Sequence, residues 1–185
     1  MLRHAGSPAL ETPRLRLRPY RAGDGADVFR NWAGDPAVAA ALGWGPHDAP
    51  EKSEALVCLW AEGYCSPTVY RWAIEKDGEV IGDIAVTRWN EAEERCELGY
   101  CLGRRFRNQG LMTEALARVL EYLLHEVGFH RVAARHDAEN AASGRVMEKC
   151  GMRFEGVSRG EKKRPDGTWM DVRTCAVLSD DPLPR

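Results

Sequence analysis

Residues 96–135 read CELGYCLGRRFRNQGLMTEALARVLEYLLHEVGFHRVAAR and predict a strand, a long helix and a second strand. The helix, over residues 109–127, is the clearest element, because apolar side chains recur at three- and four-residue spacing and Gly128 follows them. These side chains are Leu116, Val119, Leu120, Leu123, Leu124 and Val127. Strands joined through a helix run parallel with a right-handed crossover, and ligands bind beyond their carboxyl ends. We therefore expect residues 96–102 and 131–135 to be parallel neighbours beside a ligand site.

Hydrophobic patterns elsewhere predict the rest of a mixed α/β domain. Strands are expected over residues 14–20, 70–75, 80–87, 154–159 and 169–177, and helices over residues 24–32, 49–63 and 141–149. Asp77-Gly78 predicts a tight turn in an antiparallel meander of residues 70–75, 80–87 and 96–102, and a further turn is expected at residues 165–167. Asp24 is expected to cap the first helix, and Leu56, Leu59 and Trp60 to share the apolar face of the second.

The predicted sheet is mixed and mostly antiparallel, with flanking helices, and belongs to one domain over residues 10–178. Residues 1–9 and 179–185 are expected to be short tails. Residues 1–9 lack the apolar segment of a signal peptide, and no apolar run is long enough to span a bilayer. The formal net charge of -2 provides no field that would attract nucleic acid or an anionic membrane. We therefore expect a cytoplasmic monomer or homodimer with neither as a partner.

The cysteines and histidines predict no metal site. Cys58, Cys65, Cys96, Cys101, Cys150 and Cys175 form no CxxC pair. His125 and His130 are not at HxxxH spacing. Free buried thiols are the expectation, rather than a disulfide framework or a zinc site.

The loop that opens the long helix is the strongest candidate for binding an anion. It reads RNQGLMTE over residues 107–114. Main-chain N–H groups at a helix start lack intrahelical partners and lie at the positive end of the helix dipole, so they can hold a diphosphate. Gly110 permits close approach, Arg107 adds charge and Thr113 can add a donor. A P-loop is excluded because GxxxxGK[ST] is missing, but these residues alone are also compatible with an ordinary glycine turn.

A second motif, NAASGRVMEKCGM, occupies residues 140–152. Together with RxxGxx at the start of the long helix, it resembles the GNAT superfamily of acetyl-CoA-dependent N-acetyltransferases, and within it the branch that acetylates the N-termini of ribosomal proteins. ETPRL at residues 11–15, Trp44 with Pro46-His47, and ELGY at residues 97–100 also resemble that branch. The resemblance covers residues 10–178 and implies an acyltransferase with the GNAT fold.

In that fold, the resemblance implies that residues 96–102 splay away from residues 131–135 and that the acetyl-pantetheine arm lies in the gap. Main-chain groups near Tyr100, Cys101 and Leu102 would pair with pantetheine and polarise the thioester carbonyl. Asn140 would bond the pantetheine arm or an attached water. The pyrophosphate would be held by Arg107, Asn108, Gln109, Gly110, Leu111, Met112 and Thr113.

Acetyl transfer to an amine needs a proton acceptor, a donor to the oxyanion and a proton for the thiolate. Glu97 matches the carboxylate often assigned as the base in this branch, acting directly or through water; the other interpretation is a solvated strand-edge residue. Many members carry a tyrosine donor where Met147 stands, and methionine cannot donate a proton. Ser143 is the remaining candidate, although it could instead bond only the helix backbone.

Cys101 and Cys150 raise the alternative of an acetyl-cysteine intermediate. A nucleophilic cysteine needs a nearby histidine or helix N-terminus, and neither is adjacent in the sequence. Direct transfer in a ternary complex is therefore expected.

The acceptor is expected to be a protein N-terminal amine, because of the branch that the chain resembles. A small-molecule amine such as an antibiotic, a polyamine or an amino acid is the alternative, followed by a noncatalytic acyl-CoA-binding domain. Trp44 and His47 lie in a loop that walls the acceptor side in relatives. Trp44 could recognise a cation through its ring, or could serve only in packing.

Overall fold

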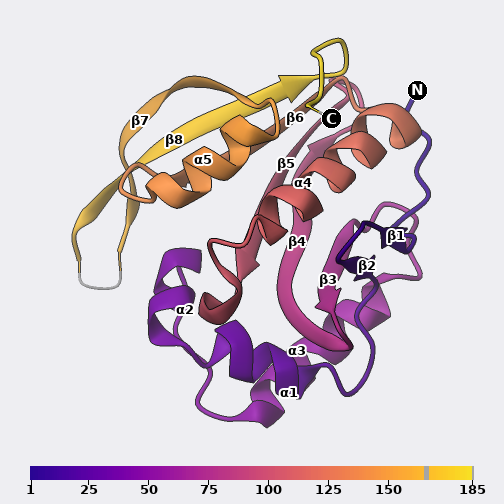
Figure 1. Ribbon diagram of the computed structural model, residues 1–185. Coiled ribbons are helices and arrows are strands. Elements are labelled where there is room, and N and C mark those ends of the chain that lie inside the picture. The colour runs from indigo at the N-terminus through magenta and orange to yellow at the C-terminus, as the bar shows by residue number, and fades with distance from the viewer. Residues whose placement is uncertain (165–166, 185) are drawn as a thin grey trace. The chain divides into compact units, whose positions relative to one another are not determined.

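The computed structural model describes residues 1–164 and 167–184 (Figure 1). The chain divides into two compact units. Unit 1 comprises Met1–Arg3, Val86–Gly99 and Leu116–Arg185, and unit 2 comprises His4–Ala85 and Tyr100–Ala115. The turn predicted at residues 165–167 includes Pro165 and Asp166, which lie outside the described residues.

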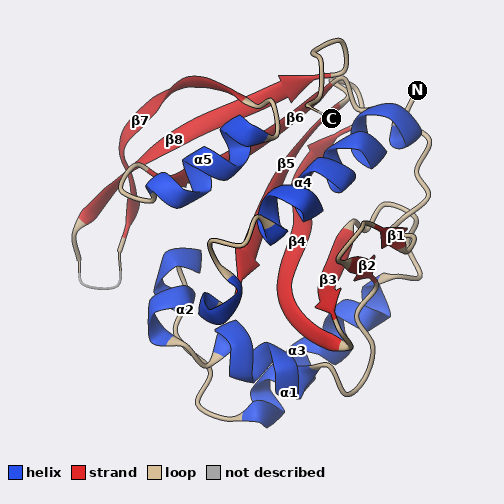
Figure 2. Cartoon of the chain, in the orientation of Figure 1, coloured by secondary structure: helices blue, strands red, loops and turns tan. Residues whose placement is uncertain are grey.

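The elements form a mixed α/β fold around an eight-stranded sheet (Figure 2). The strands are β1 (Leu10–Glu11), β2 (Arg16–Arg18), β3 (Arg71–Lys76), β4 (Glu79–Asn90), β5 (Arg95–Leu102), β6 (Arg131–Asp137), β7 (Arg153–Lys163) and β8 (Trp169–Leu178). The α-helices are α1 (Gly25–Val28), α2 (Pro36–Leu42), α3 (Pro50–Gly63), α4 (Leu111–Glu121) and α5 (Ala141–Lys149). Short helical segments of other types cover Phe29–Ala33, Arg104–Phe106 and Tyr122–Val127. The strand order is β1-β2-β3-β4-β5-β6-β8-β7, which confirms the predicted mixed sheet.

In unit 2, β2 pairs with β3 and β3 pairs with the first part of β4, both antiparallel, and the β3–β4 pair is the predicted hairpin. The β3–β4 turn has left-handed backbone at both Asp77 (φ 50°) and Gly78 (φ 82°), as the Asp-Gly pair predicts. Helices α1 and α3 pack against each other (Figure 1). The apolar core beside them contains Tyr20, Val28, Trp32, Ala33, Val38, Val57, Ala73, Val80 and Cys101.

For these helices, the predicted apolar face of α3 was wrong, the N-cap residue of α1 was predicted correctly, and one helix was not predicted. In α3, Leu59 is 63% exposed, whereas Ser53 and Val57 are fully buried, so the buried face is rotated away from Leu59. Asp24 occupies the N-cap position of α1 but makes no capping bond, because its carboxylate accepts hydrogen bonds from Arg18 instead. Helix α2 was not predicted at all, although Asp35 caps it by accepting from the Ala37 N–H.

In unit 1, β5 and β6 are parallel, with the register running from Arg95 opposite Arg131 to Leu98 opposite Ala134. This confirms the predicted strand–helix–strand unit. The apolar series predicted along the long helix is buried, and Gly128 ends the helical segment in the left-handed conformation (φ 95°). Helix α5 has the predicted bounds and contacts β6 and β7 (Figure 1). Strand β7 is longer than predicted and pairs with β8 along an extended hairpin.

Candidate active site

The predicted anion-binding loop belongs to unit 2 and leads directly into α4. Residues 107–110 are exposed, and Asn108 (φ 61°) and Gly110 (φ 76°) both adopt left-handed backbone. The Glu114 N–H donates to the Gly110 carbonyl at 3.0 Å, which makes the first helical bond of α4. The side chains of Leu111 and Met112 are buried and fix the start of the helix. The N–H groups at this start have no carbonyls upstream within the helix to accept them.

Arg104 and Arg105, which precede the loop, are both neutralised by carboxylates. Arg104 makes a two-pronged ion pair with Asp35, at 2.6 and 2.8 Å, and lowers the pKa of that carboxyl. Arg105 bonds Asn31 at 2.9 Å and pairs with Glu79. Arg107 differs, because its Nε donates to the main-chain carbonyl of Leu102 at 3.2 Å. That contact ties the loop to the end of β5 without cancelling the positive charge of Arg107.

The end of β5 lies over a buried polar cluster that the sequence analysis missed. Cys101 and Leu102 are buried and Tyr100 is half-buried. Asp83 bonds Arg71 at 2.7 Å, and the Arg71 guanidinium stacks on the Trp60 ring at 4.1 Å from its centre. Burial, reinforced by the Asp83 charge, raises the pKa of the Cys101 thiol far above its usual range. The only sequence signal of this cluster is a carboxylate inside the otherwise apolar strand VIGDIAV.

Glu97 belongs to unit 1, in the parallel-paired part of β5 opposite Ala133. Its side chain is 26% exposed, and Oε1 lies 3.3 Å from Arg88 Nη2. Thr87 Oγ1 donates to the main-chain carbonyl of Glu97 at 3.2 Å and fixes the strand locally. Glu97 is therefore a partly buried carboxylate with one cationic neighbour, and not a fully solvated strand-edge residue.

Asn140 and Ser143 meet at the start of α5. The Asn140 Oδ1 accepts from the Ser143 main-chain N–H at 3.2 Å and so caps the helix. The side-chain amide of Asn140 is thereby held in one orientation. Ser143 is half-buried, whereas Met147 is fully buried in the core. The structure therefore places the two polar candidates together and leaves Met147 a packing role.

Trp44 and His47 lie in the α2–α3 loop of unit 2. His47 is buried, its Nδ1 shares a 2.7 Å hydrogen bond with Ser53 Oγ, and its ring meets the Trp44 ring edge-on at 5.0 Å. Trp44 is partly buried against the core of unit 2. Both side chains therefore point into unit 2 and stabilise the conformation of this loop.

The pH dependence of stability is expected to report on His47. Burial, helped by the Lys52 charge, lowers the pKa of His47, so the folded chain binds this proton less readily than the unfolded chain, where histidine titrates near 6.5. Its contribution to the free energy of unfolding is then present above about pH 6.5 and is lost as the pH falls below that value. Between about pH 7 and 5.5 the Tm of the wild type should fall more than that of His47→Gln. Parallel Tm curves for the two proteins would contradict this assignment.

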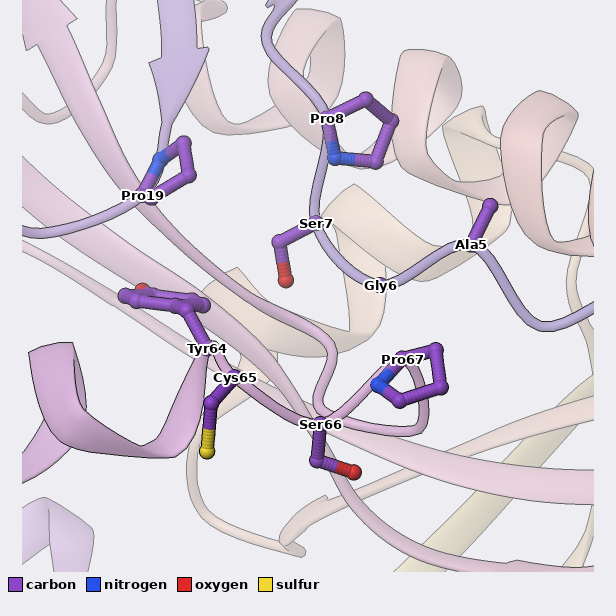
Figure 3. A pocket seen from close by; sticks show the side chains of 9 residues that line it. All are labelled: Ala5, Gly6, Ser7, Pro8, Pro19, Tyr64, Cys65, Ser66 and Pro67. Atoms are coloured by element: carbon purple, nitrogen blue, oxygen red, sulfur yellow. The ribbon is translucent and has the colours of Figure 1, made fainter.

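A separate open cavity in unit 2 contains none of the predicted site residues (Figure 3). It has a volume of about 340 Å³ and is lined by Ala5, Gly6, Ser7, Pro8, Pro19, Tyr64, Cys65, Ser66 and Pro67. Ser7 Oγ donates to the Val69 carbonyl and Tyr64 Oη to the Arg71 carbonyl, both at 2.9 Å, so these hydroxyls hold the fold together.

All six cysteines are free, but the expectation of buried thiols was wrong for Cys65, which is exposed at this cavity, and Cys58 is only half-buried.

Two kinds of feature are missing from residues 1–164 and 167–184. No cluster of three or more His, Cys, Asp or Glu side chains is placed to hold a metal ion. No helix in those ranges is long and apolar enough to cross a membrane.

Comparison with known proteins identifies the family. The acetyltransferase (GNAT) domain family matches residues 14–153. YjcK, a probable N-acetyltransferase of Bacillus subtilis (strain 168), is 32% identical over 127 residues, which are 62% of this chain and 70% of YjcK. The ribosomal protein uS5-alanine N-acetyltransferase of Escherichia coli (strain K12) is 32% identical over 89 residues, which are 48% of this chain and 45% of that enzyme.

The fold agrees with this result. The crystal structure of a GNAT-family acetyltransferase from Bacillus anthracis superposes with a TM-score of 0.81, covering 94% of this chain and 99% of that one at 24% identity. The resemblance seen in the sequence is thus confirmed over most of the chain. The protein belongs to the GNAT family and is an acetyl-CoA-dependent N-acetyltransferase.

Proposed function

We propose that the acceptor is the N-terminal amine of a protein, of the kind that ribosomal-protein acetyltransferases modify. The observation that carries this proposal is the 32% identity to the uS5-alanine enzyme over 89 residues. The motifs at residues 11–15, 97–100 and 140–152, which resemble the same branch, support it.

The loop at the start of α4 is proposed to hold the diphosphate of acetyl-CoA. Its chemistry fits the group: left-handed Gly110 keeps the main chain exposed, the N–H groups of residues 110–113 begin a helix, and Arg107 adds a positive charge. Main-chain groups of Tyr100, Cys101 and Leu102 are proposed to bind the pantetheine arm, together with the Asn140 side chain, whose orientation the Ser143 N–H fixes. Bound acetyl-CoA supplies the activated acyl group.

Glu97 is proposed to take the proton from the acceptor amine, directly or through one water. Its side chain keeps 26% of its surface exposed, so an amine or a water can reach the carboxylate, which supports this role. Ser143 is proposed to return a proton to the departing thiolate, which needs little help because a free thiol has a pKa of about 8.5. Trp44 and His47 are proposed to shape the acceptor side through the loop that they hold.

Transfer is proposed to be direct, in a ternary complex. An acetyl-cysteine intermediate would need a thiolate near neutral pH. Burial raises the pKa of the Cys150 thiol to about 12 and raises that of Cys101 further, so both stay protonated. This favours attack by the amine itself.

The test is thiol release from acetyl-CoA across a panel of acceptors. The panel should contain peptides that begin with different residues, a free amino acid, a polyamine and an aminoglycoside. We expect turnover to be fastest on peptides and to depend on their first residue. Turnover confined to small amines would replace the proposed acceptor class, and CoA binding without turnover on any amine would indicate a noncatalytic domain.

A further inference from the structure

Arg14, which precedes β2, contacts the anion-binding loop through its guanidinium. Its Nη1 donates to the main-chain carbonyl of Gln109 at 2.9 Å. A Cβ atom placed on Gly110 would lie 3.5 Å from Arg14 Nη2, so the guanidinium lies against the main chain of the loop. The Gln109 side chain is held separately, since its Nε2 donates to the Arg105 carbonyl at 3.0 Å.

The contact with the Gln109 carbonyl decides where the next N–H group points. A trans peptide is planar, and its C=O and N–H groups point in opposite directions. Because Arg14 holds the Gln109 carbonyl on its own side, the N–H of Gly110 is directed away from Arg14. Glycine accepts either orientation of the preceding peptide at low cost, so Gly110 (φ 76°) does not fix the orientation by itself.

Arg14 is itself anchored to the first turn of α4 through Glu114. Arg14 Nε and Nη2 each lie 2.7 Å from Glu114 Oε2, and the Arg14 main-chain N–H donates to Oε1 at 2.9 Å. Thr12 Oγ1 donates to the same oxygen at 2.6 Å. The Glu114 side chain is mostly buried, which tends to raise its pKa, but the bonds from Thr12 and Arg14 hold that pKa below its usual range. Glu114 thus links the chain before β2 to the start of α4, and its negative charge balances the positive charge of Arg14.

We infer that Arg14 is a positioning residue for acetyl-CoA, which aims the Gly110 N–H at the diphosphate by holding the Gln109 carbonyl. The inference rests on the proposed role of the loop. Since Glu114 already neutralises the guanidinium, Arg14 acts through the loop backbone and not as a phosphate ligand.

Arg14→Gln tests this role, with Arg16→Gln as the matched control. Arg16 is also exposed and ion-paired, to the exposed Glu11 at 3.2 Å, and no contact with the loop involves it among the described residues. We expect Arg14→Gln to weaken CoA binding about tenfold in calorimetry, since it removes a charged hydrogen bond that orders the loop. The KM for acetyl-CoA should rise by a similar factor, while kcat and the acceptor KM stay within twofold. Arg16→Gln should change none of these.

A spectroscopic readout separates orientation of the loop from general stability. The amide resonance of Gly110 in a ¹⁵N–¹H spectrum should shift in Arg14→Gln and stay in place in Arg16→Gln. Arg14→Lys should recover only part of the affinity, because an ammonium cannot bond both Glu114 and the Gln109 carbonyl with a fixed fork. If Arg14→Gln does not fold, Arg14→Lys takes its place in the comparison with Arg16→Gln.

The outcomes keep the two proposals apart. Wild-type affinity for CoA with an unmoved Gly110 resonance in a folded Arg14 variant would overturn the positioning role alone. Equal losses in the KM for acetyl-CoA and for the acceptor would overturn it too, since they indicate a merely structural effect. If the wild type itself binds CoA without any shift of the Gly110–Thr113 amides, the proposed diphosphate loop is wrong and the inference falls with it.

Discussion

Glu97→Gln is expected to lower kcat by about 10²- to 10⁴-fold, the usual contribution of a general base. Glutamine has nearly the same shape as glutamate but cannot accept the amine proton at neutral pH. The 3.3 Å contact from Arg88 can be kept by the amide oxygen, so the local structure of β5 should survive. The Kd for CoA should stay within twofold, because Glu97 is not one of the residues proposed to bind the cofactor.

The matched control for this prediction is Glu93→Gln. Glu93 is exposed, lies four residues before Glu97 and forms an ion pair with Arg95. Glu93→Gln therefore removes one negative charge, as Glu97→Gln does, but leaves the proposed base in place. Steady-state rates at saturating acetyl-CoA give kcat, and calorimetry gives the Kd. If Glu97→Gln and Glu93→Gln turn over at the same rate, Glu97 has no part in proton transfer.

Arg18→Met is expected to destabilise the fold by about 3–5 kcal/mol, the cost of removing one partner from a buried ion pair. Arg18 is 5% exposed and bonds Asp24 at 2.7 and 2.9 Å and Glu75 at 2.6 Å. Burial alone would lower the pKa of Arg18, but the two carboxylates outweigh it and raise that pKa above its usual range. Methionine fills a similar volume but removes the buried cation between Asp24, which is buried, and Glu75, which is mostly buried, and leaves them only the exposed Arg21 at 3.7 and 3.6 Å.

Arg21→Met is the matched control, because Arg21 approaches the same two carboxylates at 3.7 and 3.6 Å but is 65% exposed. An exposed pair contributes only about 0–1 kcal/mol. Urea denaturation at neutral pH, with the m-value checked for constancy, measures both effects. Similar losses in the two variants would show that burial of the Arg18 network contributes little.

The parts of the fold that were predicted correctly have a local, repeated signal. The long helix and its buried face follow from apolar spacing over residues 109–127, and the helix explains why β5 and β6 are parallel. The buried face of α3 could not be found in that way. Ser53 is buried because its hydroxyl meets His47 across a loop, and hydrophobic periodicity gives no weight to a serine.

The position of a candidate residue in the fold was predictable where its motif is contiguous in the sequence. It was not predictable where the residue depends on partners that are distant in the sequence. The loop at residues 107–113 and the start of α5 are single stretches, and the structure gives each the helix-start position expected. Arg14 and Glu114 are 100 residues apart, and nothing in either local sequence indicates their pairing. Asp24 occupies the N-cap position that its local sequence predicts. Its carboxylate nevertheless accepts from Arg18 and makes no capping bond, and nothing in the local sequence indicates that partner.

The β7–β8 hairpin has a consequence for how the chain opens. Strand β7 lies at the end of the sheet order, almost all of its residues are exposed, and its pairing with β8 shifts register between Ser158 and Lys162. Separating the outer part of this hairpin exposes little additional apolar surface to water. The free energy needed to open it is therefore a small fraction of the free energy of unfolding of the whole fold. Amide hydrogens at Ser158–Lys163 should therefore exchange with solvent through local fraying, while those of β6 exchange only when unit 1 unfolds.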